Sequence, residues 1–216
     1  MSLHITVYTD NYVVMGSDSR SSWIPDDESI PAHFEDTAEK LIKYNDYIGI
    51  SFSGHLEILH ENKVVKINDH LLQFRNDNVG VNDIDILSNA LLRSFDMYNQ
   101  KPETYFHVAG YDKNKKSFVV YKIDVKNRHC NKLDTTINDG IYDGSVDVLN
   151  NMLRNNELNG DFSDLTKSIE FIKNAIIFTA EREIERHGIK TVGGPIDILA
   201  IKPTGAFWIQ RKELHA

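Results

Sequence analysis

Residues 39–54 read "EKLIKYNDYIGISFSG", and this stretch contains the pattern that decides the fold. Two strand-like runs are joined at Asn45-Asp46, which is typical of a β-hairpin. The hairpin begins beside Lys40 and ends at Gly54, where a segment with helical spacing follows. Lys40 therefore stands at the start of one predicted strand and Gly54 at the end of the next.

Three further hairpins have the same form, with β-branched runs on either side of a short polar turn. They pair residues 4–9 with 12–18, 104–112 with 117–124, and 195–203 with 205–212. Residues 128–137 are expected to contain another strand. Residues 20–39 carry two prolines and an acidic cluster, and we expect them to form a long surface loop.

Apolar residues recur with helical spacing in four segments, which predicts four helices. These are residues 56–74, 84–95, 146–153 and 165–180. Ser145 is a suitable N-cap for the third helix. The order along the chain is then strands, two helices, strands, two helices and strands.

Short turns make consecutive strands antiparallel, and paired helices can cover the outer faces of two stacked sheets. The sequence thus predicts a single domain over residues 1–216 of the α+β class. Its architecture would be a four-layer αββα sandwich of two antiparallel sheets flanked by helix pairs. Both faces of each sheet would be covered, which agrees with strands such as residues 196–201 that are apolar on both sides.

The composition narrows the range of functions. The net charge is −8 and no Lys/Arg run is present, so we expect no nucleic-acid partner. The one cysteine, Cys130, cannot form an internal disulfide, which fits a reducing compartment. No apolar run approaches the ~20 residues of a membrane span, and the first residues do not read as a secretory signal. We therefore expect a cytoplasmic protein that does not bind membranes.

Four local motifs, in this order along the chain, resemble those of proteasome β-type subunits and their bacterial homologues among the N-terminal-nucleophile hydrolases. They are "ITVYTDNYVVMGSDSR" at 5–20, "EKLIKYNDYIGISFSG" at 39–54, "HVAGYDKNKKSFVVYKID" at 107–124 and "GGPIDILAIKPTG" at 193–205. The resemblance extends over nearly the whole chain. It implies the αββα sandwich of this family and self-association into a ring or a related oligomer. A regulatory ATPase partner is left open.

The resemblance also implies an active site without cofactor or metal, acting on a peptide or small amide. Ser2 falls on the position of the nucleophile, where the family usually has threonine, and its own α-amine would serve as the base. Lys40 falls on the lysine that tunes their pKa values, and Asp18 on its acidic partner. Gly54 would offer its backbone N–H to the oxyanion, and Arg20 would brace the site.

Three departures from the family pattern leave an alternative open. Met1 precedes Ser2 and would block the α-amine, and His4 stands where threonine is usual. The expected Asp-x-x-Ser motif before residue 193 is missing, although Glu183 or Glu185 could replace its acid. Asp139 lies near the position of a second family serine. The alternative is a catalytically inactive scaffold or binding subunit.

Two competing sites are weaker. "GISFSG" approaches the Gly-x-Ser-x-Gly elbow around Ser51, but lacks the second glycine. His55 and His60 could suggest a metal site with nearby glutamates, yet a spacing of five does not place them on one helical face. We expect that segment to be a solvated helix.

Overall fold

The computed structural model describes residues 2–25, 31–187 and 189–212 of the chain. The strands are β1 (Leu3–Tyr8), β2 (Val13–Ser17), β3 (Ser21–Trp23), β4 (His33–Glu35), β5 (Leu41–Lys43), β6 (Ile48–Gly54), β7 (Glu57–His60), β8 (Lys63–Lys66), β9 (Thr104–Asp112), β10 (Ser117–Asp124), β11 (His129–Lys132), β12 (Asp139–Gly144), β13 (Asp197–Lys202) and β14 (Gly205–Gln210). The helices are α1 (Ile67–Asp77), α2 (Ile84–Ser94), α3 (Val146–Arg154) and α4 (Leu165–His187), with a 3₁₀ turn at Phe95–Met97.

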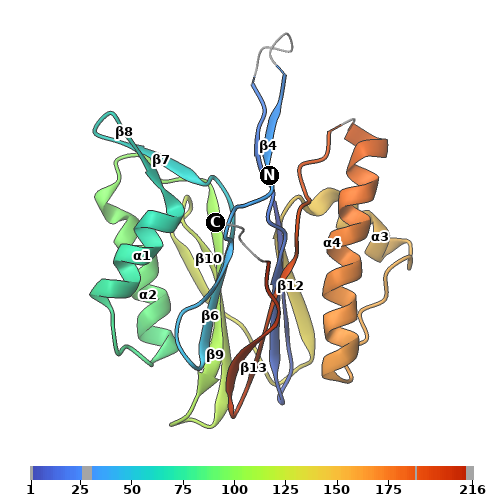
Figure 1. The fold of residues 1–216 in the computed structure, drawn as a ribbon. Coiled ribbons are helices and arrows are strands. Elements are labelled where there is room, and N and C mark those ends of the chain that lie inside the picture. The colour runs from blue at the N-terminus through green and yellow to red at the C-terminus, as the bar shows by residue number, and fades with distance from the viewer. Residues whose placement is uncertain (1, 26–30, 188, 213–216) are drawn as a thin grey trace.

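One antiparallel sheet has five strands in the order β12-β1-β2-β13-β14. Strand β1 is buried along its whole length and pairs with β2 and β12 on its two edges. Helices α3 and α4 lie against the outer face of this sheet (Figure 1). A cluster of apolar side chains between them includes Leu3, Ile5 and Val14 from the sheet and Leu149 and Ile172 from the helices.

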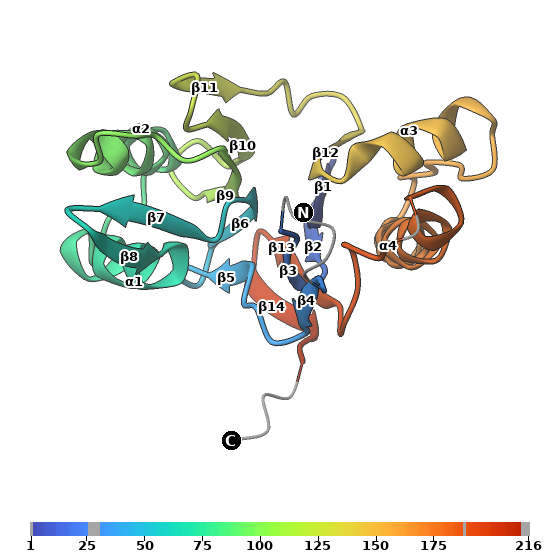
Figure 2. The same ribbon diagram turned by 90° about the horizontal axis from the view of Figure 1, so that it is seen from above.

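The other five-stranded sheet has the order β11-β10-β9-β6-β5, also antiparallel. Helices α1 and α2 lie on its outer side, seen from above in Figure 2. Apolar side chains including Ile50, Phe52, Leu71, Leu87 and Phe106 fill the space between sheet and helices. The amphipathic pattern of the second predicted helix therefore faces this core, as expected.

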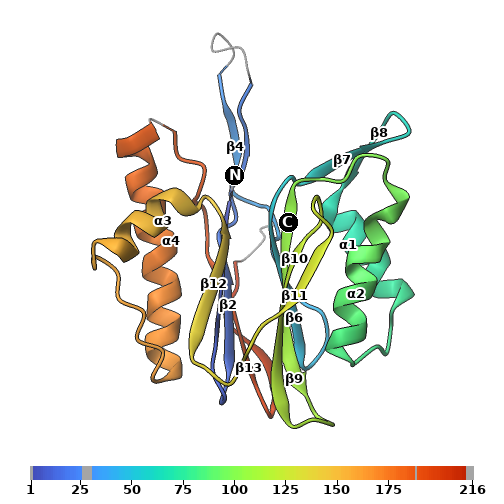
Figure 3. The ribbon, with the colours of Figure 1, turned by 180° about the vertical axis from the view of Figure 1, so that it is seen from behind.

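The inner faces of the two five-stranded sheets pack against each other (Figure 3). A third apolar cluster joins them, with Met15 and Leu199 from one sheet and Leu41, Ala109 and Val120 from the other. Because β1 and β6 both lie in the middle of this packing, their residues are brought together although they are far apart in sequence.

The predicted architecture, a four-layer αββα sandwich of two antiparallel sheets flanked by helix pairs, is wrong for this chain. The described residues contain more strand than helix, and their strands form four sheets rather than two. The two additional sheets are the hairpins β3–β4 and β7–β8, which belong to neither five-stranded sheet. The β3–β4 hairpin projects beyond the body of the molecule in Figure 1.

The error has a local physical cause. Residues 20–39 were expected to be a loop, but their ends pair as β3 and β4 on either side of the proline-containing stretch. Residues 56–74 were expected to be one helix, but α1 begins only at Ile67. Glu61 and Asn62 have positive φ angles of 50° and 62°, so the chain turns there and forms the β7–β8 hairpin.

The four hairpins expected from the sequence are confirmed by the strand pairings β1–β2, β5–β6, β9–β10 and β13–β14. Within residues 128–137 only the short strand β11 forms, and the sequence analysis did not predict β12. Among the described residues, no helix combines the length and the apolar character needed to cross a membrane.

Candidate active site

Lys40 and Asp18 form an ion pair with no solvent-exposed side-chain surface. The Lys40 Nζ lies 2.8 Å from Asp18 Oδ1, and the side chains of both residues are 0% exposed. Lys40 precedes β5 and Asp18 follows β2, so the pair joins the ends of strands from the two five-stranded sheets. Burial lowers the pKa of the Lys40 ammonium, and the Asp18 carboxylate opposes this shift.

Asp18 accepts hydrogen bonds from four residues. Its Oδ1 accepts the backbone N–H of Leu3 at 3.0 Å in addition to the Lys40 ammonium. Its Oδ2 accepts the backbone N–H groups of Arg20 at 3.2 Å and Gly193 at 3.0 Å. The carboxylate therefore connects the start of β1, the end of β2, the segment before β5 and the glycine pair before β13.

Arg20 does not contact the Asp18 side chain with its guanidinium. It forms a bidentate pair with Asp36, with Nε–Oδ1 at 2.7 Å and Nη2–Oδ2 at 2.8 Å. A third nitrogen donates to the Lys190 carbonyl oxygen at 3.2 Å. The Arg20 carbonyl oxygen accepts a hydrogen bond from Lys40 Nζ, so Arg20 braces the site through its backbone.

Ser2 lies at the start of β1, directly before the residue whose amide binds Asp18. It is 1% exposed, and its hydroxyl has no hydrogen-bond partner among the described residues. Its carbonyl oxygen accepts the backbone N–H of Ser145 at 2.7 Å. Gly144 has a φ of +108°, and a Cβ there would lie 1.7 Å from the Ser2 carbonyl oxygen. Met1 lies outside the described residues.

A second carboxylate network fixes the same region. The Ser145 hydroxyl donates to Glu183 Oε1, and the Thr191 hydroxyl donates to the same oxygen at 2.7 Å. Glu183 Oε2 accepts the backbone N–H groups of Thr191 at 2.7 Å and Val192 at 2.8 Å. Because Ser145 also binds the Ser2 carbonyl, Glu183 of α4 supports the position of Ser2.

Glu183, the acid of this network, is one of the two glutamates that the sequence analysis considered as a replacement for the acid of the missing Asp-x-x-Ser motif. The side chain of Glu185 lies outside the part of the chain whose side chains are described, and Asp139 lies at the far end of β12, opposite Tyr8. Ser145 and Thr191 were not predicted as site residues. Ser145 was interpreted as a helix cap, but its side chain makes no cap hydrogen bond in the structure.

Gly54 ends β6 with a φ of +100°, and a Cβ there would lie 2.1 Å from the Glu103 carbonyl oxygen. The Phe52 N–H donates to the Lys40 carbonyl oxygen at 3.0 Å. Alternate residues of a strand direct their N–H groups to the same side, so the Gly54 N–H also points toward the segment that carries Lys40. Gly54 thus lies at the same corner as the Lys40–Asp18 pair.

Two adjoining cavities lie beside Gly54. One, of about 470 Å³, is lined by β3, β4 and residues 54–57. The other, of about 360 Å³, shares Ser21, Glu35, Leu56 and Glu57 with the first and extends to Ala38 and Phe52. Gly54 lines the first cavity, whereas Ser2, Asp18 and Lys40 line neither of the two.

His4, whose role was open, is buried between the sheets. Its ring stacks on His107 with centroids 4.0 Å apart and planes 18° apart, and its Nδ1 lies 2.9 Å from Ser51 Oγ. His107 lies 2.9 Å from both Thr6 Oγ1 and Asp143 Oδ2. Burial lowers the pKa of both histidines, and the hydrogen bond to Asp143 opposes this for His107.

His4, His107 and Asp143 place one possible metal ligand each within 4.8 Å of one another. A single ion cannot lie in the planes of two parallel stacked rings, as imidazole ligation requires. Lys122 Nζ already pairs with Asp143 at 2.8 Å. These residues therefore fit a buried hydrogen-bonded network better than a metal centre.

The competing sites do not form. Ser51 is buried inside β6 and hydrogen-bonded to His4, so it is not at an exposed strand-to-helix turn. His60 ends β7 and His55 precedes it, so the prediction of a solvated helix there is wrong. The described residues with ligand atoms close enough to hold a metal do not include these histidines.

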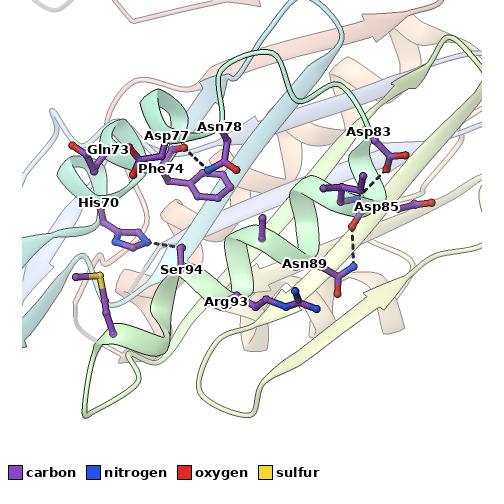
Figure 4. Close-up of a pocket in the computed structure, with 13 residues that line it drawn as sticks. His70, Gln73, Phe74, Asp77, Asn78, Asp83, Asp85, Asn89, Arg93 and Ser94 are labelled. Carbon is purple, nitrogen blue, oxygen red and sulfur yellow. Dashed lines mark hydrogen bonds between the residues drawn. The ribbon is translucent and has the colours of Figure 1, made fainter.

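A cavity of about 900 Å³ lies between α1 and α2, on the outer side of the sheet (Figure 4). His70 lines it, but its two ring nitrogens are bound at 2.8 Å by Tyr98 and Ser94 hydroxyls. Burial lowers the pKa of His70 to about 4. The Ser94 hydroxyl donates its proton to the Leu91 carbonyl oxygen at 2.7 Å rather than to His70, so this pair is not arranged as nucleophile and base.

In comparison with known proteins, the chain matches no protein-family model, and no curated protein shows significant sequence similarity to it. The functional interpretation therefore depends on the geometry just described. That geometry brings Ser2, Asp18, Lys40, Arg20 and Gly54 to one corner of the molecule.

Proposed function

We propose that this protein is an N-terminal-nucleophile hydrolase of the Ser/Thr type that cleaves peptide or other amide bonds without a cofactor. The supporting observation is the fully buried Lys40–Asp18 pair, whose carboxylate also binds the amide of Leu3. A buried ammonium costs several kcal/mol of desolvation, so its retention beside the second residue calls for a role.

The proposed chemistry begins once the bond between Met1 and Ser2 has been cut, which frees the Ser2 α-amine. The Ser2 hydroxyl attacks the substrate carbonyl carbon while its proton passes to that amine. The Gly54 N–H stabilises the resulting oxyanion. The C–N bond then breaks, and the proton moves to the leaving amine. Water hydrolyses the remaining ester, which releases the acid and restores the hydroxyl.

Lys40 contributes by charge rather than by proton transfer. An ammonium close to the α-amine and hydroxyl favours their deprotonated forms. Asp18 keeps this charge in place, and the Ser145–Glu183 network holds the Ser2 backbone. Ser145 and Thr191, which were not predicted from the sequence, would thus hold the nucleophile in position without reacting themselves.

A second candidate function is a catalytically inactive scaffold or binding subunit. The feature that favours it is the closed state of Ser2, which is 1% exposed with an unpartnered hydroxyl. In this case the buried ion pair would only connect the ends of the strands, and Ser2 would not react even with a free amine.

We also propose that the chain self-associates into a ring or a related oligomer. The proposal comes from the family resemblance, and the exposed apolar side chains of Leu72, Ile86 and Met97 on α1, α2 and the turn after α2 would be available to such an interface. Sedimentation velocity of the full chain tests the proposal: a single monomeric boundary at micromolar concentration would contradict it.

The test of catalysis is intact-mass analysis of the untagged protein, before and after treatment with an electrophilic, hydroxyl-directed probe. We expect a mass lacking Met1, followed by addition of one probe molecule that peptide mapping places on Ser2. Retained methionine without labelling would support the scaffold instead.

Ser88 provides a matched control for Ser2, because it is also buried with an unpartnered hydroxyl but lies on α2, outside the site. We expect Ser2→Ala to abolish labelling and Ser88→Ala to leave it unchanged. Equal labelling of both variants would show that the probe reacts elsewhere, for example at Cys130.

A further inference from the structure

A second buried lysine, Lys212, lies behind the proposed site and follows β14 by two residues. Its side chain is 3% exposed, and its Nζ lies 2.8 Å from Asp197 Oδ2, whose side chain is 2% exposed. The backbone N–H of Lys212 donates to Asp197 Oδ1 at 2.7 Å. Lysine and aspartate are rarely buried this far unless paired, so this contact fixes the end of β14 to the start of β13.

The remaining contacts of Lys212 reach the segments that carry the active-site pair. Its Nζ donates to the Ala38 carbonyl oxygen at 2.7 Å and to Ser19 Oγ at 3.1 Å. Ser19 stands directly after Asp18, and Ala38 stands two residues before Lys40. One ammonium therefore binds the backbone or side chain beside each member of the Lys40–Asp18 pair.

These two segments are also joined directly. The Ala38 N–H donates to the Ser19 carbonyl oxygen at 3.0 Å, and the Ser19 N–H donates to the Gly193 carbonyl oxygen at 3.1 Å. The Gly193 N–H in turn donates to Asp18 Oδ2. Lys212 therefore adds a second connection between these segments, because its Nζ binds both the Ala38 carbonyl oxygen and the Ser19 hydroxyl.

Ser19 and Lys212 do not form a second nucleophile and base. Ser19 is 0% exposed, and its hydroxyl donates to the Pro195 carbonyl oxygen at 2.6 Å. The hydroxyl proton is therefore directed away from the lysine, and no substrate can reach the oxygen without unfolding this region.

We propose that Lys212 is a positioning residue of the active site, which fixes the segments carrying Asp18 and Lys40 and adds a second buried positive charge behind them. The catalytic part of this inference rests on the proposed function. The structural and electrostatic part concerns the ionisation of Lys40 and is independent of turnover.

Burial and three neighbouring charged groups determine the direction in which the pKa of Lys40 shifts. Burial is the largest influence and lowers its pKa, Asp18 and Asp36 raise it, and Lys212 lowers it. Removing the Lys212 charge should therefore raise the pKa of Lys40.

The experiment is a pH titration of the lysine side-chain ¹³Cε signals of the full chain by NMR, with the Lys40 signal assigned by its loss in Lys40→Arg. We expect Lys212→Met to raise the Lys40 midpoint. Lys212→Arg keeps the charge and should leave the midpoint within a few tenths of wild type. Lys122→Met, which removes a lysine paired with Asp143 instead, is the control and should not move it.

An unchanged Lys40 midpoint in folded Lys212→Met, or equal shifts in the Met and Arg variants, would overturn the inference. If Lys212→Met does not fold, Lys212→Gln, which retains donors but not charge, carries the same test. Labelling of Ser2 across the same pH range should follow the Lys40 midpoint. Absence of labelling in wild type would contradict the proposed function alone, because the NMR titration requires no activity.

Discussion

At the residue scale, the candidate site depends on one ion pair that has no access to water. Neither Lys40 nor Asp18 has exposed side-chain surface, so each needs the other to compensate its charge. The four hydrogen bonds to Asp18 and the two from Lys40 leave little freedom for either group. Substitution of one partner should therefore affect stability as well as activity.

Lys40→Met should lower the free energy of unfolding by about 3–5 kcal/mol, because it leaves the Asp18 carboxylate buried without its counter-ion. Chemical denaturation monitored by circular dichroism measures this loss. Lys126→Met is the control, since its pair with Glu103 is about half exposed on both sides. Equal denaturation midpoints for the two variants would contradict the structural role assigned to Lys40.

Gly54→Ala should destabilise the protein by more than about 3 kcal/mol. The new Cβ would clash with the Glu103 backbone, and alanine would have to adopt the unfavourable φ of +100°. Gly80→Ala isolates the φ contribution: Gly80 has a φ of +87°, and a Cβ there meets nothing within 4 Å. That variant should lose only about 1–2 kcal/mol. The difference between their unfolding free energies measures the close approach at Gly54.

At the element scale, helix starts show how local chemistry shapes the fold. Asp83 caps α2 by accepting the Ile86 N–H at 2.9 Å, whereas Lys66 before α1 makes no side-chain cap. Apolar periodicity alone predicted that the second helix begins at residue 84, where α2 does begin. The start of α1 lacked such a signal, and the apolar residues of the preceding hairpin continued its periodicity by chance.

Asp83→Ala should cost about 1 kcal/mol of stability, through loss of the cap. Lys66→Asp should instead gain up to about 1 kcal/mol, because it supplies an acceptor and a negative charge at the start of α1. Urea denaturation of both variants gives the two values. A loss of stability in Lys66→Asp would mean that the lysine has a role in β8 that outweighs the cap.

Turn chemistry made the four hairpins predictable, because polar turn residues separate clear β-branched runs. It also placed Lys40, Asp18 and Gly54 at strand ends before their contacts were known. The hairpins β3–β4 and β7–β8 were not predictable, since short exposed strands have little apolar alternation. Ser145, Thr191 and Lys212 were missed because they contact the site only through tertiary packing, over sequence separations that no local pattern records.

At the scale of the whole molecule, buried histidines make stability depend on pH. Burial lowers the pKa of His4 and His107, and it lowers that of His70 to about 4. Below pH 6.5 the unfolded chain takes up protons at these positions that the folded chain does not. The free energy of unfolding is therefore highest above pH 6.5 and decreases as the pH falls toward the folded-state pKa values of these histidines.

We expect the free energy of unfolding to fall as the pH drops below 6.5, with at most about 1.4 kcal/mol per pH unit from each histidine that stays neutral in the folded chain. His4→Gln should reduce this slope by the share of one histidine. His33→Gln is the control, because its side chain is 66% exposed, and it should leave the slope unchanged. A His4→Gln slope equal to that of wild type would contradict the neutral state assigned to His4.

The most direct test of the central claim is a crystal structure of the protein after treatment with the hydroxyl-directed probe. If Ser2 is the nucleophile, we expect continuous electron density from Ser2 Oγ to the probe, with the Lys40–Asp18 pair intact beside it and a probe oxygen directed at the Gly54 N–H. Density for the probe at another residue, or an unmodified Ser2 that keeps its N-terminal methionine, would contradict it.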